Sequence, residues 1–214
     1  MKNEKLQQLR EEYSKHSLDE SDVDSNPIKQ FEQWMSEAIE AEVPEPNAMT
    51  LSTVDFQHNP HSRVVLLKEV ENEEFVFYTN YASDKGEEME ENPNVALCFM
   101  WFELERQVRI EGTVEKVPEK QSEEYFKQRP YKSQLGALAS NQSSVVPNRE
   151  FLEDRFKDME KKYKEGEVPK PDSWGGYKVK PKVIEFWQGR RSRLHDRIKY
   201  EQIGSKWDIK RLSP

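Results

Sequence analysis

Cysteine, glycine and long apolar runs are all scarce in this sequence of 214 residues, which holds 1 Cys and 8 Gly. Because Cys98 has no second cysteine to pair with, an internal disulfide is excluded and a reducing compartment is indicated. The longest apolar run, residues 95–102, falls well short of the ~20 residues that a membrane-spanning helix needs. The chain opens on polar residues, so we predict no secretory signal peptide and expect a cytoplasmic protein without a membrane partner.

The scarcity of glycine also removes the common phosphate-binding loops. Neither G-x-G-x-x-G nor G-x-x-x-x-G-K occurs, which argues against a dinucleotide-binding Rossmann unit and against a P-loop. The nucleophile elbow G-x-S-x-G is absent as well. His58 and His61 have a ligand-like spacing, but no cysteine or carboxylate cluster accompanies them, so we interpret them as solvated turn residues rather than metal ligands. Any bound phosphate must therefore be held by side chains and helix ends.

Charge is abundant but unevenly distributed. The formal net charge is −8, and charged residues make up 35% of the chain against 34% for the hydrophobic set. Such a composition alone would suggest disorder, but 5 Trp, 8 Tyr and 10 Phe favour a packed globule. Residues 1–45 hold 5 basic and 12 acidic side chains, whereas residues 178–214 hold 11 basic and 4 acidic ones. This basic end of an acidic protein requires an explanation.

Hydrophobic periodicity predicts a mainly β fold with flanking helices, an α+β arrangement. Asn26 and Pro27 begin an amphipathic helix over 27–41, and 95–102 has the continuous apolar character of a strand buried on both faces. The other expected strands cover 49–56, 63–68, 75–79, 107–115, 177–187, 193–201 and 206–211, and the other expected helices cover 119–129, 134–141 and 149–164. Consecutive strands without intervening helices favour an antiparallel barrel with helices packed outside over a Rossmann sheet. We expect one such domain over 26–214, preceded by a charged, weakly patterned segment over 1–25.

Three side chains near the predicted helix 119–129 could bind one phosphate. Tyr125 and Arg129 are four positions apart and share a face of that helix. Ser133 could cap the next helix, whose free N–H groups attract anions. A phenol, a guanidinium, a hydroxyl and a helix N-terminus would then converge on one group. An ordinary surface arginine remains the alternative for Arg129.

A second pair of basic residues, Arg63 and Lys68, brackets an apolar run of four residues in an expected strand. On a regular strand, residues five positions apart point to opposite faces. The spacing therefore predicts that the two cations serve different ligand groups.

A third cationic group lies in the C-terminal region. On the strand expected from residue 193, Arg193, His195 and Arg197 share one face. Adjacent cationic side chains repel each other unless an anion lies against them. A solvated basic face stays open as an alternative, and so does a nucleic-acid-binding strip. The overall acidity and the lack of a stacking-aromatic array disfavour nucleic acid as a partner.

Several motifs occur together in an order known from one family. They are Arg63-Val64-Val65-Leu66-Leu67-Lys68, Phe77-Tyr78-Thr79-Asn80, Leu104-Glu105-Arg106-Gln107-Val108, Tyr125-Phe126 with Arg129-Pro130 and Ser133-Gln134, Gln142-Ser143-Ser144, Trp174-Gly175-Gly176, and the run from Ile184 to Arg197. In these motifs the chain resembles the pyridoxamine 5′-phosphate oxidase family, the FMN enzymes that make pyridoxal 5′-phosphate. The resemblance covers nearly the whole chain from about residue 27.

The resemblance implies an FMN-binding split β-barrel that works as a homodimer, with two sites at the subunit interface. The implied reaction oxidises pyridoxamine 5′-phosphate or pyridoxine 5′-phosphate to pyridoxal 5′-phosphate, with hydride transfer to FMN and reoxidation by O2 giving H2O2. A split-barrel flavin oxidoreductase with another substrate is one alternative, and a non-catalytic carrier of FMN or pyridoxal phosphate is another. No metal is implied.

The resemblance also assigns residues to the cofactor. The FMN phosphate would be held by Arg63, Lys85, Gln142 and Ser143. The rest of the cofactor site would come from Val64, Val65, Leu66, Leu67, Lys68, Tyr78, Thr79, Gln107, Trp187 and Arg197. One position departs from the family, which often has Arg-Lys where this chain has Asp84-Lys85, so one cationic contact to the phosphate would be lost.

On the substrate side, the resemblance completes the phosphate clamp and adds two catalytic residues. The substrate phosphate would contact Lys68, Tyr125, Arg129 and Ser133. Arg193 and His195 would act as the catalytic residues against the pyridine ring and its hydroxyl. The stretch from Arg10 to Tyr13 resembles a mobile segment that closes over the substrate.

Overall fold

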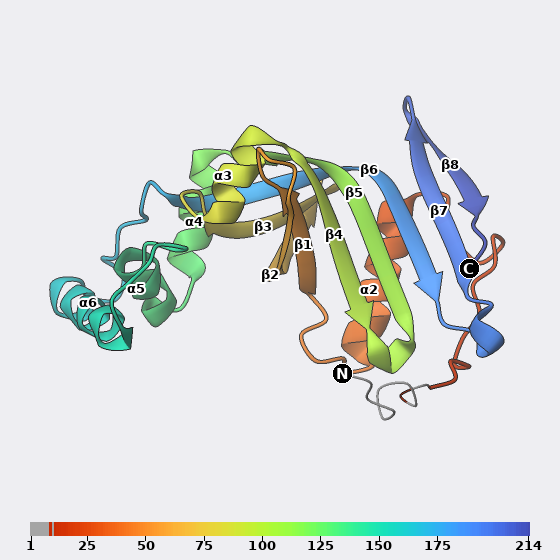
Figure 1. Ribbon diagram of the computed structural model, residues 1–214, viewed down its shortest axis with the longest axis horizontal. Coiled ribbons are helices and arrows are strands. Elements are labelled where there is room, and N and C mark those ends of the chain that lie inside the picture. The colour runs from red at the N-terminus through yellow and green to blue at the C-terminus, as the bar shows by residue number, and fades with distance from the viewer. Residues whose placement is uncertain (1–8, 10) are drawn as a thin grey trace. The chain divides into compact units, whose positions relative to one another are not determined.

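The structure, a computed structural model, describes residue 9 and residues 11–214 (Figure 1). The helices are α2 (Pro27–Glu40), α3 (Asp84–Glu91), α4 (Glu119–Gln128), α5 (Tyr131–Ala139) and α6 (Arg149–Lys162), with 3-10 turns η1 (Phe102–Leu104) and η2 (Arg191–Arg193). The strands are β1 (Ala48–Val54), β2 (Pro60–Glu71), β3 (Glu74–Asn80), β4 (Asn94–Trp101), β5 (Arg106–Lys116), β6 (Trp174–Gln188), β7 (Asp196–Ile203) and β8 (Lys206–Arg211). Within this described part, no helix is long and apolar enough to cross a membrane.

The strands form one sheet in the order β3-β2-β1-β4-β5-β6-β7-β8, and β3 also pairs with β6. This extra pairing closes β1 to β6 into a six-stranded antiparallel barrel, while β7 and β8 continue the sheet beyond it. The antiparallel β3–β6 ladder runs from Phe75 opposite Val179 to Asn80 opposite Trp174. The predicted barrel with flanking helices is confirmed.

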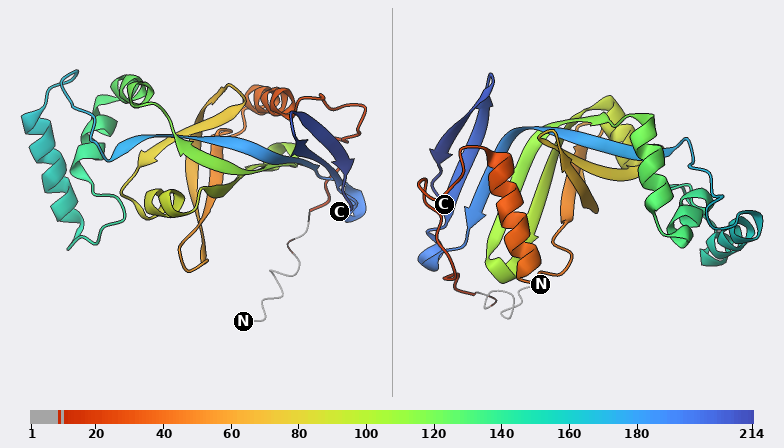
Figure 2. Two further views of the ribbon diagram at one scale, coloured as in Figure 1. Left: turned by 90° about the horizontal axis from the view of Figure 1, so that it is seen from above. Right: turned by 180° about the vertical axis from the view of Figure 1, so that it is seen from behind.

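The chain divides into two compact units, which are described separately. Unit 2 comprises Leu51–Ala96 and Gly112–Pro181, and unit 1 comprises the rest of the described chain. In unit 1, α2 starts as the sequence predicts, because Asn26 Oδ1 accepts a hydrogen bond from Ile28 N and Pro27 takes the first helical position. The helix α2 lies against the strand segments of unit 1 (Figure 2). Its aromatic rings pack on them, with the Phe31–Phe99 ring centroids 5.0 Å apart and those of Trp34 and Phe186 5.2 Å apart.

In unit 2, the helices α4, α5 and α6 gather around one apolar cluster (Figure 2). Its buried members are Phe126, Leu135, Val168 and Trp174. Phe156 and Met159 of α6 are partly buried against the same cluster. Because Trp174 begins β6, the cluster joins these helices to the β3–β6 ladder.

Two strand predictions are wrong in detail. Burial along β4 alternates, and Cys98 on its less buried side is half-exposed, so the strand is not buried on both faces. The strand expected from residue 193 begins only at Asp196. Before it, η2 forms a tight turn in which Ser192 and Arg193 have φ values of 55° and 60°. These left-handed backbone conformations cannot continue a strand.

One helix, α3, was not expected. Ser83 occupies its N-cap position, and Asp84 and Glu87 lie in its first turn, where carboxylates favour a helix. Gly86 is required inside α3, because a Cβ at this position would lie 2.1 Å from the carbonyl oxygen of Tyr81. The glycine weakens the helical pattern in the sequence while allowing the helix to pack closely on the chain before it.

Candidate functional site

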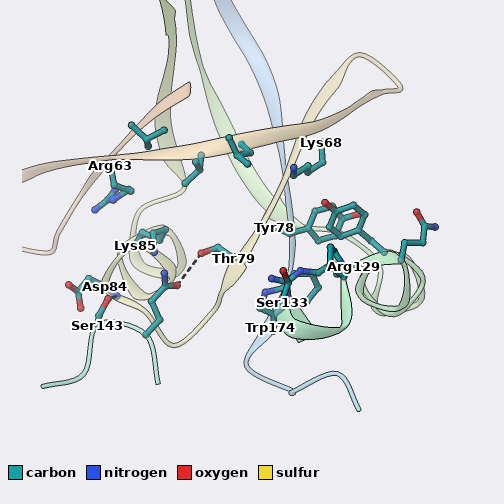
Figure 3. A pocket seen from close by; sticks show the side chains of 17 residues that line it. Arg63, Lys68, Tyr78, Thr79, Asp84, Lys85, Arg129, Ser133, Ser143 and Trp174 are labelled. Atoms are coloured by element: carbon teal, nitrogen blue, oxygen red, sulfur yellow. Dashed lines mark hydrogen bonds between the residues drawn. The ribbon is translucent and has the colours of Figure 1, made fainter. Parts of the chain in front are cut away.

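Unit 2 contains a cavity of about 810 Å³, here called the main cavity, which is within the usual size range of small-molecule sites (Figure 3). Its lining residues are Arg63, Val64, Val65, Leu66, Lys68, Tyr78, Thr79, Asp84, Lys85, Tyr125, Gln128, Arg129, Pro130, Ser133, Gln142, Ser143 and Trp174. Most residues predicted for the cofactor and the substrate phosphate therefore lie around one space. Leu67 does not line it and is buried instead.

A bulge in β2 explains why Arg63 and Lys68 line the same cavity, although regular alternation predicts opposite faces. The register against β3 passes from Leu67 opposite Phe77 to Glu69 opposite Val76, which leaves Lys68 as an extra residue. A bulge of one residue reverses the alternation of side chains beyond it. The two cations lie at separate positions along the cavity wall (Figure 3).

At one end of the cavity, Arg63 is held by a carboxylate. Arg63 Nη2 lies 3.1 Å from Glu88 Oε2, and its Nη1 donates to the hydroxyl of Thr53. Thr53 and His61 also contact the Glu88 carboxylate. His61 is exposed, as expected, but it lies on β2 and pairs with this carboxylate rather than lying in a turn. Although burial opposes ionisation, the hydrogen bonds from Thr53 and His61 and the charge of Arg63 keep the pKa of Glu88 below its ordinary value.

Lys85 lies at the same end, in the first turn of α3. Its Nζ is 3.1 Å from the Ser83 hydroxyl, and its side chain is buried. Burial, followed by the nearby charge of Arg63, lowers the pKa of Lys85. Ser143 adds a hydroxyl that accepts a hydrogen bond from the Asp84 backbone N–H at 3.2 Å. We define Arg63, Lys85, Asp84, Glu88 and Ser143 as the paired end of the cavity.

At the other end, Arg129 is a partly buried cation that pairs with no carboxylate of the described residues. Its backbone is fixed between α4 and α5, because its N–H bonds to Phe126 O and its carbonyl accepts from Gln134 Nε2 at 2.9 Å. Its Nη1 atom is buried and has no hydrogen-bond partner among the described residues. Burial lowers the pKa of Arg129, opposed by the nearby Tyr125 phenol. An arginine remains charged under these conditions, so this end attracts an anion.

Three aromatic rings form a stack beside Arg129. Tyr78 and Tyr125 stack with centroids 3.9 Å apart, and Trp174 lies 5.5 Å from Tyr78 at an interplanar angle of 10°. The Tyr78 hydroxyl is buried and also has no hydrogen-bond partner within the described chain. Burial raises the pKa of Tyr78, so the phenol stays protonated and can donate to an anion. We define Arg129, Tyr78, Tyr125 and Trp174 as the aromatic end.

Ser133 lines the aromatic end from α5, but not as the helix cap that we predicted. Pro130 takes the cap position, and α5 begins at Tyr131. Ser133 lies in the first turn, where its own N–H bonds to Pro130 O at 2.8 Å. The proline before Tyr131 is the reason that the helix begins earlier than expected.

Unit 1 holds the remaining predicted residues. A second, smaller cleft is lined by Leu9, Glu11, Glu12, Tyr13, Arg190, Ser192, Arg193 and His195. The rings of Tyr13, Trp187 and His195 contact one another, with the Trp187–His195 centroids 4.6 Å apart. Arg10 lies outside the described residues.

His195 is held in its neutral form. The backbone N–H of Arg190 donates to His195 Nδ1 at 3.1 Å, which requires that Nδ1 carry no proton. Burial, together with the charge of Arg193 and against that of Asp196, lowers the pKa of His195. Arg193 itself is exposed in η2.

Arg197 does not share a face with Arg193 and His195, because only Arg197 lies on β7. It pairs with the buried Glu185 carboxylate through Nε at 2.8 Å and Nη2 at 3.1 Å. The hydrogen bond to Glu185 raises the pKa of Arg197. Gln107 lies on β5, also within unit 1.

The arrangement in unit 2 fits a ligand that carries phosphate groups. Each end of the main cavity presents cationic and hydroxyl donors, and two buried donors of the aromatic end have no partner in the part of the chain that the structure describes. Such atoms are destabilising unless a ligand or water satisfies them. The Val64, Val65 and Leu66 segment between the ends supplies an apolar wall. The residues present therefore fit FMN at the paired end, and among the described residues no carboxylate, cysteine and histidine group suits a metal ion.

Two functional residues were missed by sequence reasoning. Trp174 appeared only as part of a motif, without a role, and Glu88 lies in the unpredicted α3. The signal for Trp174 is the pair of glycines that follows it in the sequence. Gly176 lets β6 approach Tyr78 closely, because a Cβ added at residue 176 would lie 2.8 Å from a ring carbon of Tyr78. No local pattern marks Glu88 as the partner of Arg63.

Two models of known sequence families match most of the chain. The model of a family described as "Pyridoxamine 5'-phosphate oxidase" matches residues 35–163. A second model, described as "Pyridoxine 5'-phosphate oxidase C-terminal dimerisation region", matches residues 174–214.

Individual relatives cover almost the full chain. A pyridoxine/pyridoxamine 5′-phosphate oxidase from a Cyanothece species is 52% identical, with 98% of each chain aligned. One from Haemophilus influenzae is 54% identical over 98% of this chain and 99% of its own. Among solved structures, PhzG from Burkholderia lata in complex with tetrahydrophenazine-1-carboxylic acid matches with a TM-score of 0.87 and 28% identity, covering 94% of this chain and 100% of that one.

Proposed function

Because this chain belongs to the pyridoxamine 5′-phosphate oxidase family, we propose that it oxidises pyridoxamine 5′-phosphate and pyridoxine 5′-phosphate to pyridoxal 5′-phosphate with FMN as its cofactor. One observation in the main cavity carries the proposal for this chain. Arg129 and Tyr78 both line this cavity, and their Nη1 and Oη atoms are buried and have no partner within the described residues. A substrate phosphate would satisfy both donors.

We assign the two ends of the cavity to two phosphate groups. At the paired end, Arg63, Lys85 and Ser143 would hold the phosphate of FMN together with the neighbouring Gln142. At the aromatic end, Tyr125 and Arg129 would hold the phosphate of the substrate together with the neighbouring Lys68 and Ser133. Binding energy at a phosphate far from the reacting carbon fixes the position of that carbon, which is how a clamp contributes to catalysis.

Bound FMN would supply the redox chemistry, taking up a hydride from C4′ of the substrate and passing the electrons to O2 to give H2O2. The protein supplies position and charge. Tyr78, Thr79, Gln107, Trp187 and Arg197 would line the ribityl chain and the flavin ring. The apolar wall of β2 would exclude water from one side of the cofactor.

We assign the catalytic roles to Arg193 and His195, which would lie against the pyridine ring and its hydroxyl. Arg193 stays charged and can orient an anionic ring oxygen. The pKa of His195 is lowered, and its Nδ1 already accepts the Arg190 backbone N–H, so the neutral ring carries its proton on Nε2 and can donate a hydrogen bond to the substrate from that atom. Tyr13, whose ring contacts Trp187 and His195, belongs to the segment that would cover the substrate.

Residues 174–214 match a dimerisation region. We propose that the enzyme is a homodimer with two sites at the subunit interface and that it works in the cytoplasm. A split-barrel flavin enzyme acting on another substrate is the second candidate, because the similar PhzG structure holds a phenazine precursor rather than a phosphorylated pyridine.

The visible spectrum of the purified protein tests the proposal. We expect flavin absorption, and we expect pyridoxamine 5′-phosphate to bleach it under anaerobic conditions while unphosphorylated pyridoxamine at the same concentration does not. Readmitting O2 should restore the colour and release H2O2. A protein that takes up FMN but is not bleached would support the second candidate, and one that cannot take up FMN would refute both.

A further inference from the structure

We propose that Trp174 is a positioning residue for substrate binding, whose indole holds the guanidinium of Arg129 in place for the phosphate ester. This inference rests on the proposed function, because it takes the substrate phosphate as the ligand of Arg129. Trp174 lines the main cavity, and its ring contacts Tyr78 and the guanidinium of Arg129.

The aromatic rings are the groups that orient Arg129. Its guanidinium carbon lies 4.6 Å from the centroid of Trp174 and 5.6 Å from that of Phe126. In the described chain, no carboxylate forms an ion pair with Arg129, and the charged or titratable neighbour that affects its pKa is the Tyr125 phenol. A cation over the face of an indole is attracted by the ring quadrupole, and this attraction is largest when both are removed from water.

Holding a guanidinium with a ring differs from holding it with a carboxylate. A carboxylate takes two N–H donors in a bidentate pair, as Glu185 does with Arg197. A ring face attracts the positive charge of the guanidinium but accepts no hydrogen bond from the N–H groups that lie in the guanidinium plane. Trp174 can therefore restrict the side chain of Arg129 while its donors stay available to phosphate oxygens.

Trp174 is itself well fixed. It is 6% exposed, packs edge-on against Phe126 with centroids 5.1 Å apart, and stacks on Tyr78. Its carbonyl accepts a hydrogen bond from Lys170 Nζ at 3.0 Å, and Lys170 also pairs with Glu119 at 2.7 Å. The support of Arg129 is thus part of the rigid β3–β6 ladder rather than of a loop.

The test compares substrate affinity with turnover. Trp174→Leu, which keeps an apolar side chain but removes the ring, should raise the KM for pyridoxamine 5′-phosphate about tenfold, which lies between the values expected for an exposed and for a fully desolvated cation–π contact. Inorganic phosphate, used as a competitive inhibitor, should lose affinity by a similar factor. The kcat at saturating substrate and the FMN content per subunit should not change. Trp174→Phe, which retains a ring face, should recover most of the lost affinity.

A matched control and a double variant separate positioning from general packing. Phe156→Ala removes a ring from the same apolar cluster without contacting Arg129, so it should lower the melting temperature and leave KM unchanged. If Trp174 acts through Arg129, then Trp174→Leu should have almost no effect on KM in an Arg129→Met background. Trp174→Met replaces Trp174→Leu if the latter does not fold.

The outcomes distinguish the inference from the proposed function. A wild-type enzyme that does not oxidise pyridoxamine 5′-phosphate overturns the function itself. With an active wild type, the inference is overturned by an unchanged KM in Trp174→Leu, by a KM rise matched in Phe156→Ala, or by full additivity with Arg129→Met. A selective, ring-dependent and non-additive rise in KM supports it.

Discussion

The two ends of the main cavity hold their arginines in opposite ways. At the paired end, Arg63 is bound by Glu88 and Thr53, and an acid, Asp84, lies beside Lys85. At the aromatic end, Arg129 faces rings and keeps a buried donor free of partners within the described chain. The first arrangement neutralises part of the cationic charge before any ligand arrives, and the second leaves the charge intact.

The difference shows how one cavity can treat two phosphates differently. A cation that already has a carboxylate is well ordered, but a phosphate must compete with that carboxylate for its donors. A cation held by rings has all its donors free, and it destabilises the ligand-free protein because its buried donor is unsatisfied. The paired end thus favours stability of the protein, and the aromatic end favours the response to a ligand.

Arg129→Met should produce the largest effect. The variant keeps the apolar stem and removes a charged donor set, so we expect the KM for pyridoxamine 5′-phosphate to rise about 100-fold, the loss expected for hydrogen bonds to a charged group. FMN content should not change. Because an unpartnered buried donor is removed, the melting temperature of the substrate-free protein should stay equal or rise. Steady-state kinetics and thermal melts check both, and a fall in stability would contradict the contrast between the ends.

Glu88→Gln should act on stability rather than on substrate affinity. Breaking the pair with the partly exposed Arg63 should lower the free energy of unfolding by about 1–2 kcal/mol at neutral pH. Since the pKa of Glu88 is held below its ordinary value of 4.5, this contribution is complete above that pH and is lost as the pH falls through the folded pKa.

Denaturant unfolding of wild type and Glu88→Gln should therefore converge toward acid pH. The exposed Glu91 provides a matched control on the same helix, outside its first turn, and Glu91→Gln should leave the unfolding curve nearly unchanged at every pH. A gap between wild type and Glu88→Gln that widens on acidification would show that the carboxylate is not stabilised by its partners.

Asp84→Asn should have the smallest effect, confined to the paired end. Removing an exposed negative charge beside Lys85 should tighten FMN binding about two- to fivefold at low salt, and the gain should shrink as salt screens the interaction. The KM for pyridoxamine 5′-phosphate should not change. Glu90→Gln makes the same change in net charge at the far end of α3 and should leave the FMN dissociation constant unaltered. Equal effects of both variants would mean that only net charge matters.

Local spacing predicted much of the fold and part of the site. The helix 119–129 was found from its periodicity, and Tyr125 and Arg129 came together because four residues make about one helical turn. The helix at Pro27 was found because an asparagine cap and a proline mark its start. These features depend on residues close together in the sequence.

The missed features depend on distant contacts or on backbone irregularities. The position of Trp174 is fixed by the pairing of β6 with β3, two strands whose paired residues are more than ninety positions apart in the chain. Glu88 reaches Arg63 from a helix whose pattern is weakened by Gly86. The left-handed conformations of Ser192 and Arg193, which delay the start of β7, have no signal in residue type, because neither is a glycine or an asparagine.

Because Lys68 is an extra residue in a bulge of β2, a change at this position can alter substrate binding without altering the pairing of the strands. Deleting a single codon there would let β2 pair with β3 without interruption, and the ladder and the buried Leu67 would both survive. The cavity would lose a cation from the wall next to the aromatic end, while Arg63 would keep its place. A descendant with such a deletion would keep its cofactor contacts and, with Lys68 lost, bind the substrate phosphate more weakly through the remaining residues of the aromatic end.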